Sequence, residues 1–173
     1  MTKWALKTLC VFNFLLLILL CGCNSYSEYY DIKTDFTAEF KASYRNAQYS
    51  GSVSNNRQGL TYISISSPKE LEGIGFYYKS GELEMSREEL VCSADEAYLP
   101  QKSFPSLLRS IMNGVSQGRE EMLSNDDSTR TYRIKTDSGE CLLNTDFDGN
   151  ILCAEMKDAE LKIEFTKIKA TEN

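Results

Sequence analysis

The sequence predicts an α+β fold in which one large curved antiparallel sheet carries one short covering helix. Two observations lead to this prediction. From residue 36 to residue 168, about nine or ten short stretches alternate apolar and polar residues and are separated by turn residues. One stretch, Phe104 to about Gln117, instead repeats its apolar residues with the period of a helix.

The first 22 residues differ in composition from the rest of the chain. Lys3 and Lys7 accompany an apolar run, Leu9 to Leu20, that is too short for an ordinary membrane span. This pattern predicts a secretory signal peptide over residues 1–22. The residues that follow the run, Leu20-Cys21-Gly22-Cys23, resemble a bacterial lipobox, and the alternative is an ordinary signal peptide that contains cysteines. The lipobox implies that Cys23 becomes the new N-terminus and carries acyl chains such as palmitate.

Residues 23–34 then form the lipidated N-terminus and a short polar tether, and residues 35–173 form one β-rich domain. Once residues 1–22 are removed, 17 of the 19 basic residues remain against 25 acidic ones, a net charge of −8. This charge disfavours nucleic-acid binding and general attraction to anionic headgroups. We therefore expect the lipid itself to hold the protein at the extracytoplasmic face of the cell membrane.

The strands before the helix are read from alternation. Phe36, Ala38, Phe40, Ala42 and Tyr44 alternate with polar residues, which predicts a strand with one buried face. Similar patterns predict strands at about 49–54 and 60–66, and a hairpin around Gly81 from about 74 to 86.

The helix begins at Phe104, with Pro105 in its first turn. Its apolar residues fall on one face: Leu107, Leu108, Ile111, Met112 and Val115. Gly114 and Gly118 are its candidate ends. After the helix, alternation predicts further strands at about 121–124, 129–136, 140–145, 151–157 and 161–168.

The stretch NTDFDGNILCAE, from Asn144 to Glu155, has two interpretations. Its oxygen-bearing side chains fit the spacing of a helix-loop-helix calcium site, with Gly149 at the sharp bend. However, the flanking residues read as strands, and Asp148-Gly149 is a strong turn dipeptide. The second interpretation, a β-hairpin without a metal site, is the one that we predict.

The sequence offers no catalytic constellation. It contains no histidine, which removes Ser-His-Asp and Cys-His catalysis as well as imidazole zinc sites. Cys92, Cys141 and Cys153 have no metal-ligand spacing, and either hairpin register keeps Cys141 and Cys153 apart, so free thiols are expected. The acidic pairs Glu120-Glu121 and Asp126-Asp127 are ordinary solvated charge. We therefore predict a protein that is not an enzyme and has no cofactor.

The lipobox is followed by the phrases FTAEFKASY, LTYISISS, FPSLLRSIMNGV and TDFDGNILCAEMKDAELKIEF, in this order. This order resembles the LolA/LolB-like family of periplasmic lipoprotein carriers, which includes LppX and the sensor domain of RseB. The resemblance implies an unclosed β-barrel or half-barrel whose helices cover an apolar cavity for acyl chains. The helix that contains Pro105 would match such a lid.

A candidate ligand site follows from the strand faces and the helix. We expect an apolar ligand, a lipid or acyl chain, to contact Phe36, Phe40, Tyr44, Ile63, Ile65, Phe76, Leu161, Ile163 and Phe165 beneath Leu108, Ile111 and Met112. The alternative is that these side chains simply fill a core. In that case the protein is a non-enzymatic interaction or sensor module whose partner is another protein of the cell envelope.

Overall fold

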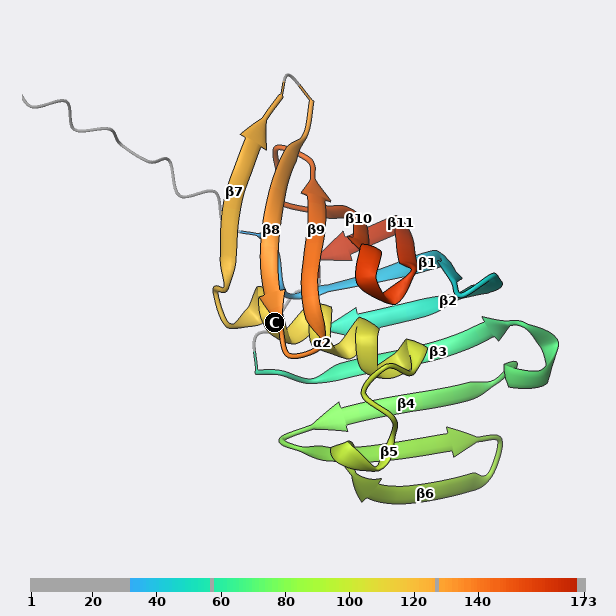
Figure 1. Cartoon of the computed structure of the whole chain (residues 1–173). Helices are drawn as coiled ribbons and strands as arrows, with labels where there is room; N and C mark the ends of the chain where they lie inside the picture. The colour runs from blue at the N-terminus through green and yellow to red at the C-terminus, as the bar shows by residue number, and fades with distance from the viewer. Residues whose placement is uncertain (1–31, 57, 127, 171–173) are drawn as a thin grey trace, which may run out of the picture. The chain divides into compact units, whose positions relative to one another are not determined.

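The structure, a computed structural model, describes residues 32–56, 58–126 and 128–170, which belong to one compact unit, Asp31–Asn173 (Figure 1). The predicted signal peptide, Cys23 and most of the predicted tether lie outside the described residues. Before the helix run β1 (Phe36–Tyr44), β2 (Ala47–Asn55), β3 (Thr61–Ser67), β4 (Ile74–Lys79), β5 (Glu82–Arg87) and β6 (Leu90–Asp95). The helix α2 (Phe104–Ser116) is followed by β7 (Glu120–Asn125), β8 (Arg130–Thr136), β9 (Gly139–Thr145), β10 (Ile151–Met156) and β11 (Leu161–Ala170).

All these strands form one antiparallel sheet in the order β6-β5-β4-β3-β2-β1-β11-β10-β9-β8-β7. Strands β6 and β7 are its two edges, so the sheet is not closed. The first and last strands pair with each other in the middle of the sheet, where Phe40 lies opposite Phe165. The predicted fold class, an open antiparallel sheet with one α-helix, is therefore confirmed for the described part of the chain (Figure 1).

The predicted number of strands was too low, because the sheet has eleven strands. Strand β6, with the sequence LVCSAD, was missed. Five of its six residues are exposed, and its three consecutive apolar residues do not alternate with polar ones. An edge strand that is covered on neither face lacks the alternation of apolar and polar residues from which strands are predicted.

The hydrophobic core lies between one face of the sheet, called the inner face here, and helix α2. Along β1, buried and exposed residues alternate without a break. The apolar residues of α2 predicted to share one face, Leu107, Leu108, Ile111, Met112 and Val115, are all buried. The core also includes Ile32, which precedes the predicted domain start at residue 35. Because the core of the described residues lies within Asp31–Asn173, this unit is expected to fold without the segments before it.

Of the two glycines predicted as candidate ends of helix α2, Gly114 and Gly118, only Gly118 lies at its end. Gly114 lies inside the helix, where a β-carbon would come within 2.6 Å of the Ile134 Cγ2 atom on β8. Its role is therefore close packing against the sheet. Gly118 has a φ of +64° just after the helix, as expected for a residue that ends one.

The segment Asn144–Glu155 is a hairpin, as predicted. Strands β9 and β10 flank it, and Cys153 lies opposite Asn144, while Cys141 and Cys153 remain free thiols. The carboxylate of Asp146 closes the turn by accepting hydrogen bonds from the backbone N–H (2.8 Å) and side-chain amide (2.7 Å) of Asn150. The backbone N–H of Lys33 donates to the Gly149 carbonyl, which ties the turn to the start of the described chain.

Replacing Asp146 with alanine is expected to lower the free energy of unfolding by about 1 kcal/mol at neutral pH. Partial burial raises the pKa of the Asp146 carboxyl, but the hydrogen bonds from Asn150 and from the backbone of Asp148, together with the positive charge of Lys33, lower it more, so that it lies below its ordinary value. A depressed pKa in the folded state stabilises the protein above the ordinary aspartate pKa of about 3.9. The stabilisation is lost as the pH falls through the lower folded value.

Urea unfolding of the wild type and of Asp146→Ala between pH 3 and 7 tests this. The difference should be full above about pH 5 and should shrink as the solution becomes more acidic. Asp148→Ala, in the same turn but with an exposed carboxylate, is the control and should change little. A difference between wild type and Asp146→Ala that is the same at all pH values would contradict the interpretation.

Two other kinds of feature are absent from the described residues. None of their helices is both long and apolar enough to span a membrane. Within residues 32–56, 58–126 and 128–170, no three or more Cys, Asp or Glu residues gather in a way that would hold a metal ion.

Candidate functional site

The residues predicted to bind a ligand all come from the inner face or from α2, and the structure brings them together. The residues that lie in the buried core are Phe36, Phe40, Tyr44, Ile63, Ile65, Leu108, Ile111, Met112, Leu161, Ile163 and Phe165. Phe76 is half-buried and packs against the margin of this core. Ligand binding by these residues remains a prediction.

Aromatic side chains occupy the space beneath the first turn of α2. The Phe104 ring stacks on Tyr49 with 4.5 Å between ring centroids, and its centroid is 5.5 Å from that of Phe40. The hydroxyl of Tyr44 donates a hydrogen bond to the backbone carbonyl of Lys102, just before the helix. The helix therefore rests on a packed aromatic layer at this end.

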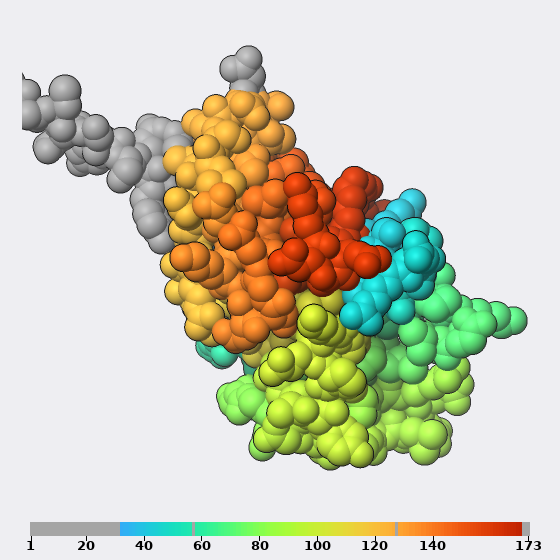
Figure 2. Space-filling view, in the orientation of Figure 1, coloured from blue at the N-terminus to red at the C-terminus, as the bar shows by residue number. Residues whose placement is uncertain are grey.

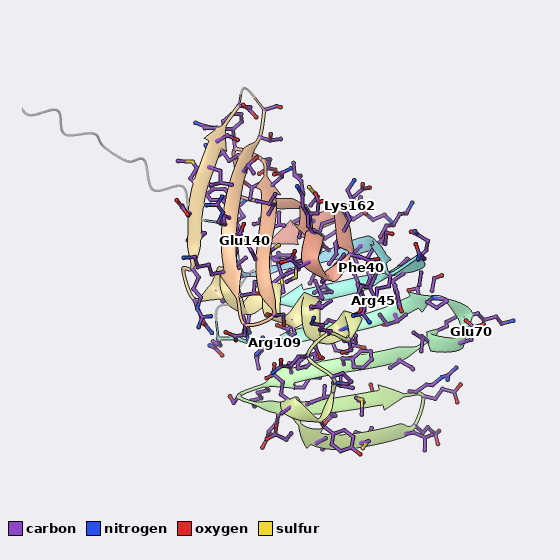
Figure 3. The ribbon with its side chains drawn as sticks, viewed as in Figure 1. Phe40, Arg45, Glu70, Arg109, Glu140 and Lys162 are labelled. Atoms are coloured by element: carbon purple, nitrogen blue, oxygen red, sulfur yellow. The ribbon has the colours of Figure 1, made fainter. Side chains whose placement is uncertain are left out.

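Arg109 holds the middle of α2 to the sheet (Figure 3). Its side chain is only 6% exposed. One guanidinium nitrogen donates to the Thr61 hydroxyl at 2.7 Å, another lies 3.4 Å from a Glu96 carboxylate oxygen, and the group lies over the Tyr78 ring. The helix is thus attached to β3, β4 and the one-turn helix η2 (Glu96–Tyr98) by a buried polar side chain.

The inner face continues beyond the helix toward the β6 edge. Residues opposite each other in an antiparallel sheet point to the same face, so the pairings define one row across six strands. From the middle of the sheet to its edge, this row is Ala38, Val53, Ile63, Phe76, Met85 and Cys92. Its first three residues are buried, Phe76 and Met85 are half-buried, and Cys92 is exposed. The apolar inner face is therefore covered at β1 to β3 and becomes increasingly exposed to solvent from β4 to β6.

A groove of about 380 Å³ lies at this edge and is called the edge groove below. Its lining residues are Ile74, Met85, Ser86, Arg87, Leu90, Val91 and Cys92. Leu90 and Val91 are 78% and 61% exposed. Leu90 lies on the inner face, opposite Arg87, and Val91 lies on the other face, opposite Ser86. The space-filling view shows the segment from η2 into α2, in yellow-green, in front of the strands that lead to this edge (Figure 2).

Two other cavities are lined mainly by polar residues. One, of about 350 Å³, lies between η2, the polar side of α2 and the β8–β9 turn, and includes Glu96, Ser110 and Asp137. The other, of about 620 Å³, lies on the opposite face of β4 to β6 and includes Tyr77 and Glu84. Because desolvating carboxylates beside an acyl chain costs free energy, an apolar ligand fits the edge groove better than either polar cavity.

The edge groove was not predicted from the sequence because strand β6 was not predicted. Ile74 and Met85 were assigned to strands, but nothing indicated that a further strand would extend their face. The run Leu90-Val91-Cys92, between Glu89 and Ser93, is the one local signal, and its three apolar residues are fewer than the four to eight from which a strand is usually read. Its exposure could not be read from the sequence.

Cys92 gives the edge groove a chemical marker. It is the exposed free thiol among the three cysteines of the described chain, whereas Cys141 is buried and Cys153 is half-buried. Burial raises the pKa of the Cys141 thiol to about 12, so at neutral pH this residue is hardly nucleophilic. An alkylating reagent should therefore modify Cys92 first.

No protein-family model matches the chain, and no curated protein matches its sequence. Solved structures do match its fold. An uncharacterized conserved protein from Thermus thermophilus is 11% identical with a TM-score of 0.50, and the match covers 80% of this chain and 79% of that chain. At this identity the likeness concerns the fold alone.

Two further solved structures match with lower TM-scores. A LolA superfamily protein from Nitrosomonas europaea is 12% identical with a TM-score of 0.43, over 83% of this chain and 90% of that chain. A DUF1329 family protein from Desulfovibrio piger is 12% identical with a TM-score of 0.40, over 81% and 87%.

Proposed function

We propose that the protein is a membrane-anchored extracytoplasmic lipoprotein that binds an apolar ligand, a lipid or acyl chain, on the inner face of its open sheet. The observation that carries this proposal is the uncovered apolar end of the inner face, the edge groove. Its volume of about 380 Å³ lies in the range of roughly 300–1,000 Å³ that is typical of small-molecule sites. No catalytic group is needed for this function.

The edge groove also relates the proposed function to the ligand residues predicted from the sequence. Phe76 lies opposite Met85, which lines the groove, and Ile63 lies opposite Phe76. The groove is therefore the solvent-facing end of the same apolar row that runs beneath α2. A ligand that first occupies the groove contacts the margin of the core without any displacement of the helix.

The membrane part of the proposal rests on the sequence. The lipobox-like residues that end at Cys23 support a lipid anchor on the extracytoplasmic side. The alternative function, an interaction or sensor module without a bound lipid, is favoured by the filled space beneath α2. The stacked rings of Phe104 and Tyr49 belong to that space. A binding measurement separates the two functions.

The test uses the unlipidated chain, residues 24–173, and the neutral fluorescent probe N-phenyl-1-naphthylamine. We expect saturable binding of the probe, and about tenfold weaker binding by Leu90→Gln, because polar substitution of a groove side chain removes roughly 1.4 kcal/mol of apolar contact. Leu90 is exposed, so the substitution should leave the fold intact. Leu123→Gln is the matched control, because Leu123 is an exposed leucine on the opposite edge strand, β7.

Alkylation provides a second readout that reports position. Bound probe should slow the reaction of Cys92 with iodoacetamide several-fold while leaving the slower reaction of Cys153 unchanged, as measured by peptide mass spectrometry. If the probe does not bind, or if it binds without protecting Cys92, the edge groove is not the ligand site. The interaction module would then be the better description.

A further inference from the structure

We infer that the edge groove selects an anionic single-chain amphiphile, a fatty acid in its carboxylate form. Its acyl chain lies along Met85 and Cys92, and its carboxylate is bound by Arg87. The inference rests on the proposed function and names the ligand class of the same groove.

The register of the sheet puts Arg87 among the apolar lining residues. Arg87 lies opposite Ile74 on β4 and opposite Leu90 on β6, so the three side chains share the inner face in one row. Met85 is two residues earlier on the same strand and therefore points to the same face. The Arg87 side chain thus extends from the same apolar face that lines the groove.

Arg87 is also the one charged residue among the seven that line the edge groove. Its Nη1 atom donates to the backbone carbonyl of Glu70 at 3.4 Å, at the end of the sheet marked by Glu70 in Figure 3. Within the described part of the chain, no carboxylate lies within the 4.0 Å ion-pair distance of Arg87. By contrast, Arg133 on β8 contacts both Glu121 and Glu140.

The chemistry of this arrangement matches a carboxylate. A guanidinium presents a planar fork of N–H donors that can bind both oxygens of a carboxylate at once. One backbone carbonyl uses only a fraction of the five N–H donors of Arg87. The acidic residues of the β5–β6 turn, Glu88 and Glu89, do not line the groove. An apolar groove with a single cation fits an acyl chain with a negative end.

The test compares two ligands of equal chain length, decanoate and 1-decanol, by their displacement of the neutral fluorescent probe from the unlipidated chain at neutral pH. We expect decanoate to bind about tenfold more tightly than 1-decanol. In Arg87→Gln the affinity for decanoate should fall to that for 1-decanol, which itself should not change. Arg133→Gln, an arginine outside the groove, is the control and should leave both affinities unchanged.

The outcomes separate this inference from the proposed function. If decanoate and 1-decanol both displace the probe and protect Cys92 equally, the groove binds apolar chains but the selection by Arg87 is overturned. If neither ligand displaces the bound probe, the inferred ligand class is overturned, whereas the proposed function fails only if the probe itself does not bind or does not protect Cys92. Sedimentation with phosphatidylcholine vesicles tests whether a membrane surface occupies the groove instead. If the protein binds vesicles but neither soluble ligand, the groove is a membrane contact, which also overturns the inference.

Discussion

Replacing Gly51 with alanine is expected to be the most damaging single-methyl addition in the described sheet, with a loss of about 3–5 kcal/mol in the free energy of unfolding. A β-carbon at Gly51 would lie 1.9 Å from the backbone carbonyl oxygen of Ser64 on β3. The oxygen cannot move away without breaking the pairing of β2 with β3. Gly51 lies opposite Phe40 and Ile65, so the disturbance would reach the core.

Thermal unfolding followed by circular dichroism measures this effect. A loss of this size should lower the melting temperature by about 10 °C or more in a domain of this length. Gly75→Ala is the matched control, because Gly75 also lies in a strand but its added β-carbon would meet the ends of the Ser86 and Tyr62 side chains at 2.8 and 2.9 Å. Tyr62 is 40% exposed and can move, so a loss of no more than about 1 kcal/mol is expected. Equal losses for the two variants would show that the carbonyl contact is not the cause.

The two glycines illustrate what could be predicted from the sequence and what could not. Strand β1 was predictable because Phe36, Phe40 and Tyr44 alternate with polar residues, and alternation is a local property. Nothing local distinguishes Gly51 from Gly75, because the difference is made by the carbonyl or the side chain that the neighbouring strand presents. Contacts between strands depend on register, which a single stretch does not reveal.

In the candidate site, too, local features were predictable and contacts between strands were not. The residues predicted to line it were brought together on one face because each belongs to a strongly periodic strand or to α2. The edge groove was not predicted because it depends on β6, whose pairing with β5 leaves Leu90 beside Arg87. A site at the edge of a sheet requires the order of the strands. That order is established by contacts between segments distant in the sequence.

Arg109 is a further residue whose position the sequence does not predict. On a helical projection it falls outside the apolar stripe formed by Leu107, Leu108 and Ile111, so solvent exposure is the ordinary expectation. In the structure, its side chain is 6% exposed because η2 and β3 cover that side of α2. The chain thus buries a charge at the contact between its only described α-helix and the sheet.

Replacing Arg109 with alanine is therefore expected to lower the free energy of unfolding by about 2–4 kcal/mol. The variant loses the 2.7 Å hydrogen bond to the Thr61 hydroxyl, the packing of the guanidinium over Tyr78, and the partner of Glu96. Arginine and alanine have similar helix propensities, so the loss reports contacts with the sheet and not the helix itself. Glu96 is 31% exposed and remains hydrated, which keeps the loss below that of a fully buried pair.

Two controls show whether the buried guanidinium is responsible for this loss. Arg133→Ala removes an arginine with two ion pairs, to Glu121 and Glu140, but its side chain is 37% exposed, and a loss of about 0.5–1 kcal/mol is expected. Glu96→Gln should also cost less than about 1 kcal/mol, because it leaves the hydrogen bond from Arg109 to Thr61 in place. Urea unfolding gives all three values. If Arg109→Ala costs no more than Arg133→Ala, the attachment of α2 to the sheet does not depend on Arg109, and the apolar contacts of the helix alone hold it over the inner face.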